Sequence, residues 1–74
     1  MKETRIKLGI DDVIGFVKAA VECDFDIDVR YNRVMVDAKS ILGVMSMDLG
    51  NVLTVKCYGE SQKFDDFLQK YAVA

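Results

Sequence analysis

Polar and apolar residues alternate most regularly in residues 24–31, which read Asp-Phe-Asp-Ile-Asp-Val-Arg-Tyr. Strict alternation is typical of a β-strand with one buried face and one solvated face. A short turn at residues 32–33 and a second strand at residues 34–37 follow, so the whole stretch predicts a β-hairpin. The three aspartates of the first strand would stand in a row with spacings of about 6–7 Å, which favours a solvated face over a cation site.

Two further strands are predicted outside the hairpin. Residues 4–8 alternate, with Thr4, Ile6 and Leu8 on one face and charged residues on the other. Residues 52–58 place Leu53, Val55 and Cys57 on one face. Each pattern indicates a half-buried strand.

Three helices are predicted between and after the strands. Residues 13–21 repeat apolar side chains at helical spacing and predict a helix that ends near Cys23. Residues 64–71, behind a capping Ser61, show the same spacing. Residues 41–47 form a third segment of about two turns, too short to be stable alone. Ser40 stands where an N-cap of this segment belongs.

The predicted order is therefore β-α-β-β-α-β-α. Strands with one wet face and helices with one apolar face predict an α+β fold, an open-faced β-sandwich in which all helices cover one side of a four-stranded antiparallel sheet. The 74 residues suffice for a single domain, residues 1–74, without linkers.

Composition narrows the function classes. The net charge is −2 and the basic residues are scattered, which argues against nucleic-acid binding. No apolar segment approaches the ~20 residues of a membrane span. The first residues carry no apolar signal region, so a cytoplasmic location is expected.

The chain has no histidine and only two cysteines. Histidine is the commonest general base and metal ligand, and no ligand spacing for zinc is present, so we expect no catalytic residue, no metal site and no cofactor. Cys23 and Cys57 are expected to be reduced and buried, and the alternative is a disulfide or redox switch.

One segment carries a family resemblance. Residues 31–46, Tyr-Asn-Arg-Val-Met-Val-Asp-Ala-Lys-Ser-Ile-Leu-Gly-Val-Met-Ser, closely resemble the bacterial HPr family, phosphocarriers of the sugar phosphotransferase system, in which a hairpin leads into a Lys-Ser-Ile-x-Gly-Val-Met-Ser stretch. The predicted element order extends the similarity over nearly the whole chain. The resemblance implies the same HPr-like fold.

The active-site loop of that family is altered here. HPr carriers have a loop of the form Gly-Ile-His-Ala-Arg-Pro-Ala, whose histidine accepts and passes on a phosphoryl group. The corresponding residues are Gly9, Ile10, Asp11 and Asp12. Matching Gly9 and Ile10 to the motif places Asp11 at the histidine and needs a two-residue deletion in the helix; without that gap, Gly9 falls there. Either alignment rules out a phosphohistidine relay.

Asp11 and Asp12 have three interpretations. They cap the first helix and complement its dipole, or they imitate the charge of a phosphorylated histidine, or Asp11 carries an aspartyl phosphate. The last is the weakest, because the neighbouring Asp12 carboxylate repels an incoming phosphate dianion.

The resemblance makes Ser40 a candidate phosphorylation site. In HPr proteins of low-GC Gram-positive bacteria, the corresponding serine is phosphorylated by an HPr kinase/phosphorylase, and the product binds a transcriptional regulator in carbon catabolite repression. A paralogue, the catabolite-repression HPr, lacks the histidine and keeps this serine. A phosphate at a helix N-terminus meets free amide groups. The alternative is that Ser40 is only a helix cap.

The segment behind Ser40 is a candidate contact surface. It is too short to bury all its apolar side chains, so Val44 and Ile41 are expected in the core and some of Leu42, Met45 and Met47 on the surface. In the HPr family this helix and the active loop form a shared docking face. The candidate partner-binding residues are therefore Ile41, Leu42, Met45 and Met47.

These observations give two functional hypotheses. The first is a non-enzymatic HPr-like regulatory or adaptor protein that binds HPr kinase/phosphorylase, a transcriptional regulator or another HPr-docking protein through the Ser40–Met47 segment, under control of Ser40 phosphorylation. The alternative is an HPr-fold scaffold that serves subunit association, such as a homodimer, or ligand binding.

Overall fold

The computed structural model describes residues 2–73 and contains four strands, three α-helices and one short 3₁₀ helix. In chain order the elements are β1 (Lys2–Ile6), η1 (Ile10–Asp12), α1 (Val13–Val21), β2 (Ile27–Tyr31), β3 (Val34–Asp37), α2 (Ile41–Met45), β4 (Leu53–Cys57) and α3 (Gln62–Gln69).

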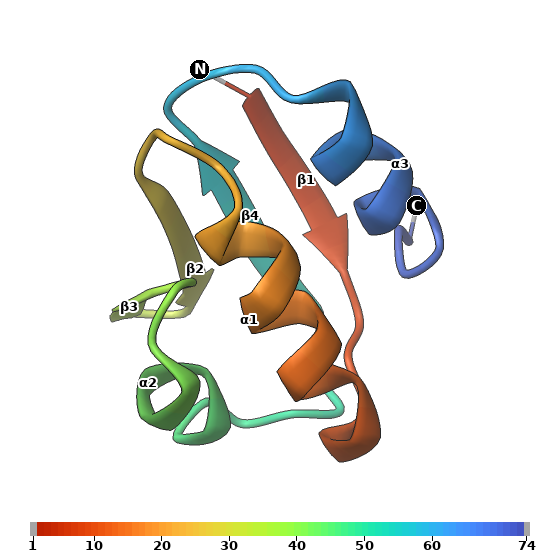
Figure 1. Ribbon diagram of the computed structural model, residues 1–74. Helices are drawn as coiled ribbons and strands as arrows, with labels where there is room; N and C mark the ends of the chain where they lie inside the picture. Colours follow the sequence, from red (N-terminus) through yellow and green to blue (C-terminus); the bar gives the residue numbers. More distant parts are fainter. Residues whose placement is uncertain (1, 74) are drawn as a thin grey trace.

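The strands form one antiparallel sheet in the order β1-β4-β2-β3. The helices cover one side of this sheet, with α1 across its middle and α2 and α3 on either side of α1 (Figure 1). The predicted α+β open-faced sandwich is thus confirmed. Within residues 2–73, no helix is long and apolar enough to cross a membrane.

Alternation along the central strands separates the two faces of the sheet. On β4, Leu53, Val55 and Cys57 are buried, whereas Thr54 and Lys56 between them are half-buried on the outer side. The pairing of Val29 with Val55 places the inner face of β2 in line with that of β4. The core between the sheet and the helices consists of Ile6, Leu8, Val13, Phe16, Val17, Ala20, Cys23, Ile27, Val29, Ala38, Val44, Met47, Leu53, Val55, Cys57, Phe64 and Leu68.

Strand ends deviate from the predicted ranges where the chain must change direction. β1 ends at Ile6, and Leu8 is buried in the connection to η1. The amide of Lys7 donates to the carbonyl of Tyr71 at 3.0 Å. The amide of Val73 donates to the carbonyl of Arg5 at 2.9 Å. The C-terminal segment therefore lies along the free edge of β1.

The predicted hairpin is confirmed, although its first strand, β2, begins at Ile27 and not at Asp24. β3 has the predicted bounds at Val34–Asp37, and Asn32 in the turn adopts a φ of 54°, which asparagine tolerates better than most residues. On the outer face, Asp28 accepts a hydrogen bond from the Tyr58 hydroxyl at 3.0 Å and lies 3.5 Å from the Arg30 guanidinium. In residues 2–73, no three acidic or cysteine side chains are grouped to hold a metal ion.

Two glycines give opposite predictions for stability. A Cβ at Gly59 would lie 2.5 Å from the Phe25 ring, so Gly59→Ala should lower the free energy of unfolding by about 1–3 kcal/mol. A Cβ at Gly15, inside α1, would meet its nearest atom, Cζ of Phe67, at 3.9 Å. Gly15→Ala should therefore raise the free energy of unfolding by about 0.5–1 kcal/mol. Urea unfolding measures both, and equal effects of the two substitutions would contradict this packing.

Candidate functional site

Ser40 is the N-cap of α2, as predicted. Its Oγ accepts a hydrogen bond from the amide of Gly43 at 3.1 Å, and its carbonyl accepts the amide of Val44 at 3.0 Å. The residue is exposed. The hydroxyl oxygen acts as an acceptor in this cap, so the capping bond does not use the hydroxyl hydrogen.

The turn before Ser40 is held by hydrogen bonds from both sides. Asp37 Oδ1 accepts the amide of Lys39 at 2.9 Å, and the carbonyl of Asp37 accepts the amide of Ser40 at 3.0 Å. The ammonium group of Lys39 donates to the carbonyl of Cys23 at 2.8 Å, just beyond the end of α1. Ser40 is therefore positioned by contacts with both β3 and the end of α1.

Only part of the predicted contact surface is exposed. Leu42 is 80% exposed, Met45 is 47% exposed and Ile41 also lies on the surface, whereas Val44 is fully buried. The candidate Met47 is wrong as a surface residue, because it is only 5% exposed and belongs to the core. The expected burial of Ile41 is also wrong. α2 ends at Met45, so Met47 lies beyond the helix and helical spacing does not decide its burial.

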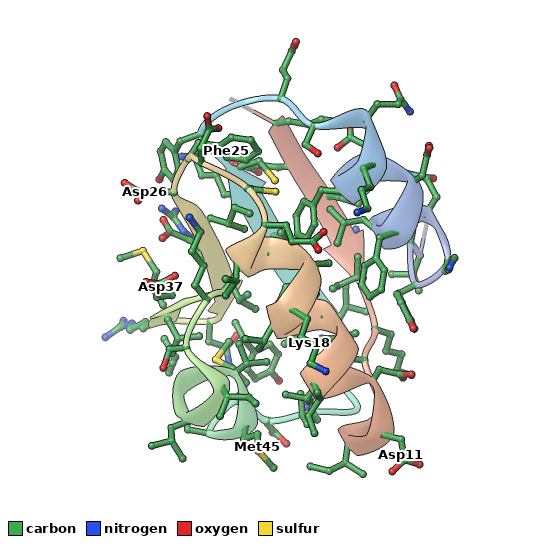
Figure 2. All side chains as sticks on the ribbon, viewed as in Figure 1. Asp11, Lys18, Phe25, Asp26, Asp37 and Met45 are labelled. Carbon is green, nitrogen blue, oxygen red and sulfur yellow. The ribbon has the colours of Figure 1, made fainter. Side chains whose placement is uncertain are left out.

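The 3₁₀ helix and the first turn of α1 add two exposed apolar side chains, Ile10 and Ile14. α1 packs against α2. The start of α1 and α2 lie at the same end of the molecule, where Met45 and Asp11 both project (Figures 1 and 2). We call the exposed side chains of these elements the docking patch. It comprises Ile10, Ile14, Ile41, Leu42 and Met45.

The sequence held a signal for the two additions. In residues 13–21 the buried positions are Val13, Phe16, Val17 and Ala20, and Ile14 falls outside this helical stripe. An isoleucine outside the buried stripe is a surface residue. Ile10 immediately precedes Asp11 and Asp12, and a position beside two charged residues is also typical of the surface.

The acidic pair before α1 does not cap that helix through its side chains. Asp12 occupies the N-cap position but makes no capping bond to α1; its Oδ2 accepts the amide of Gly9 at 3.0 Å instead. This bond is the Asp12 half of a capping box at the start of the 3₁₀ helix, which leads directly into α1. The expected capping by Asp12 is therefore found at the 3₁₀ helix and not at α1. Burial, and then the nearby Asp12 carboxylate, raise the pKa of Tyr71. Asp11 is exposed beside the docking patch.

Both cysteines are free and buried. Burial raises the pKa of Cys57 to about 11. The expected burial of the two free thiols is confirmed. Because the thiolate is the nucleophilic form, a thiol with so high a pKa is a poor nucleophile.

A cavity of about 380 Å³ lies between α1 and α3. Its lining includes the buried Cys23 and Phe64 and the exposed Lys63–Glu22 ion pair, whose nitrogen and oxygen are 3.0 Å apart. The alternation and periodicity of the sequence gave no indication of it. The lining residues come from α1, α3 and their ends, and none belongs to α2 or to the docking patch.

Comparison with known proteins gives one family. A family model described as the PTS HPr component phosphorylation site matches residues 13–69, a stretch that includes Ser40 and α2 and begins directly after Asp12. Two solved structures are similar over nearly their whole length. HPr-C-His from Thermoanaerobacter tengcongensis is 28% identical, with a TM-score of 0.78, and the match covers 95% of this chain and 93% of that one. The phosphocarrier protein HPr from Bacillus anthracis str. Ames is 25% identical, with a TM-score of 0.75, and the match covers 97% and 94%.

The buried Cys57 thiol predicts a loss of stability at high pH. The unfolded thiol ionises near pH 9 and the folded one near pH 11, so between these values the unfolded state binds fewer protons. The contribution of Cys57 to the free energy of unfolding should then fall by up to about 1.4 kcal/mol per pH unit. Urea unfolding of wild type and Cys57→Ala at several pH values measures this, because the stability advantage of wild type should shrink as pH rises. A constant difference would contradict it.

Proposed function

This chain belongs to the HPr family, and we propose that it is a non-enzymatic regulatory or adaptor protein of that family. As one HPr-like domain, it binds protein partners through the docking patch, and phosphorylation of Ser40 controls that binding in carbon catabolite regulation. The partners are an HPr kinase/phosphorylase and a transcriptional regulator or another HPr-docking protein.

The observation that carries the proposal is the apolar surface beside Ser40. Leu42 is 80% exposed and Met45 is 47% exposed. Ile10 and Ile14 are also exposed, on the elements that lie at the same end of the molecule (Figure 1). An apolar patch of this kind on a small domain typically marks a partner site. Methionine suits such a surface because its side chain is flexible and polarisable.

The absence of histidine removes the carrier chemistry of the family but leaves this surface in place. Asp11 and Asp12 stand in the region where HPr carriers hold the phosphorylated histidine. Asp12 is engaged with the Gly9 amide, whereas Asp11 is exposed beside the patch. Of the two aspartates, Asp11 is therefore the one that can present a fixed negative charge to a partner, in place of a transferred phosphoryl group.

Two properties of Ser40 support control by phosphorylation: its side chain is accessible, and its backbone is held in one position. Its side chain is exposed, and its backbone is held by Asp37 and Val44. A phosphoryl group would add about −1.5 to −2 charges at pH 7 at the rim of an otherwise apolar surface. Such a change favours partners with arginine or lysine at the matching position and disfavours purely apolar or acidic ones.

The first prediction concerns Ser40 itself. After incubation with ATP and an HPr kinase/phosphorylase from a low-GC Gram-positive bacterium, the intact mass should increase by one phosphate. Ser40→Ala should abolish the increase.

The matched control is Ser61→Ala. Ser61 caps α3 as Ser40 caps α2, with its Oγ accepting the amide of Phe64 at 3.1 Å. Each alanine variant therefore loses one cap, worth about 1 kcal/mol, but only Ser40→Ala should lose the phosphate. Absence of modification in wild type, or equal loss in both variants, would contradict the proposed site and favour the scaffold alternative.

The second prediction concerns the docking patch. Leu42→Asp should lower kcat/KM of the kinase toward this protein by at least about tenfold, because an exposed interface anchor contributes 1–2 kcal/mol or more to binding. The free energy of unfolding should change by no more than about 0.5 kcal/mol at so exposed a position.

Val21→Asp serves as the matched control for Leu42→Asp. Val21 is also a well-exposed apolar side chain, but it is the last residue of α1, at the opposite end of that helix from Ile14. Its substitution should leave kcat/KM unchanged. A similar decrease for both variants would argue against docking through α2.

A further inference from the structure

β3 lies at one edge of the sheet and pairs only with β2 among the described strands. The opposite edge strand, β1, is partly covered by the C-terminal segment through the Lys7–Tyr71 and Val73–Arg5 backbone bonds. No comparable segment among residues 2–73 pairs with the outer side of β3. An uncovered edge is a template for pairing with another strand.

The backbone groups on this edge can be assigned from the ladder. The amide of Ala38 donates to the carbonyl of Ile27 on β2 at 2.9 Å. Because neighbouring residues of a strand point their backbone groups in opposite directions, Val34 and Val36 also face β2. The backbone groups of Met35, and the amide of Asp37, therefore point away from the sheet.

The side chains on this edge are unusual for an exposed strand. Val34 is 51% exposed and Met35 is 58% exposed, although they lie on opposite faces of the sheet. The strand has no proline, lysine or inward-pointing charge, which are the usual protections of a free edge. Its charges stand only at the two ends, at Arg33 and Asp37.

The sequence of this edge is complementary to itself. Residues 33–37 read Arg-Val-Met-Val-Asp, symmetric about Met35 with opposite charges at the two ends. We propose that β3 pairs antiparallel with β3 of a second copy of this chain, centred on Met35, so that one continuous sheet runs through a symmetric homodimer. This inference does not depend on the proposed function, because neither Ser40 nor the docking patch takes part.

Antiparallel pairing in this register satisfies each position. Met35 faces Met35 of the second copy, and the outward backbone groups of the two residues bond to each other. Val34 faces Val36 of the second copy on the inner side, which covers the exposed valine. Arg33 faces Asp37 of the second copy, once at each end. Asp37 Oδ1 already accepts the Lys39 amide, so Oδ2 is the oxygen that the guanidinium meets.

The size of the strand sets the expected strength. Protein interfaces that bury less than roughly 1,200 Å² of total surface are typically weak and transient. Pairing of two short strands buries less than this area. We therefore expect a reversible dimer with a dissociation constant of about 1 μM to 1 mM. Sedimentation equilibrium of the unmodified protein across this concentration range should show a monomer–dimer exchange.

Charge reversal tests the register. Arg33→Asp alone places Asp against Asp, and Asp37→Arg alone places Arg against Arg, so each variant should weaken the dimer at least tenfold. In an equimolar mixture of the two variants, every charged pair is again opposite in sign, so a heterodimer should form. The double variant Arg33→Asp/Asp37→Arg should likewise recover the dimer.

A backbone test avoids the charges and the Asp37–Lys39 contact. Met35→Pro removes an amide that faces away from the sheet, a position where an edge strand tolerates proline. It should abolish the dimer while circular dichroism shows the fold retained, and Met35→Val, which keeps the amide, should still dimerise. A wild-type protein that is monomeric up to about 1 mM would overturn the proposal. A dimer that persists in Met35→Pro would also overturn it. So would a dimer that is disrupted by Leu42→Asp.

Discussion

The fold depends on one constraint: a four-stranded sheet with apolar side chains on a single face. The alternation on β4, with Leu53, Val55 and Cys57 buried and Thr54 and Lys56 turned outward, gives the helices only one side to cover. Three helices must then fit over the same face. α1 takes the middle and packs against both of the others, so α2 is left at an end of the sheet with little area to cover.

The candidate docking surface follows from that crowding. α2 is a five-residue helix that buries Val44 alone among its own residues. Such a helix has no intrinsic stability in water, and the Ser40 cap and the core contacts of Val44 and Met47 hold it in place. Its remaining apolar side chains have no inner surface to reach. The same geometry thus gives Ser40 its capping role and leaves Leu42 and Met45 exposed.

The sequence was informative wherever one local rule decides the structure. Alternation located the hairpin and both faces of β4, and the serine caps at Ser40 and Ser61 were identified from residue type and position. It failed where the path of the chain depends on distant contacts. Periodicity cannot place Met47, because α2 has already ended there, or predict that a 3₁₀ turn directs the Asp12 carboxylate toward Gly9. The cavity between α1 and α3 joins segments about 40 residues apart, which no local pattern relates.

The two proposed surfaces meet at one turn. Asp37 ends the β3 edge, and its side chain and carbonyl hold the amides of Lys39 and Ser40, so the position of Ser40 is set partly by the strand that would pair with a second copy. A phosphate on Ser40 would bring its negative charge close to Asp37, whose carboxylate is proposed to meet Arg33 of that copy. Thermodynamic linkage requires that whatever free energy phosphorylation adds to dimerisation, dimerisation adds equally to phosphorylation. The dissociation constant of the dimer with and without the phosphate measures that coupling directly, and equal values would show that the two surfaces act independently.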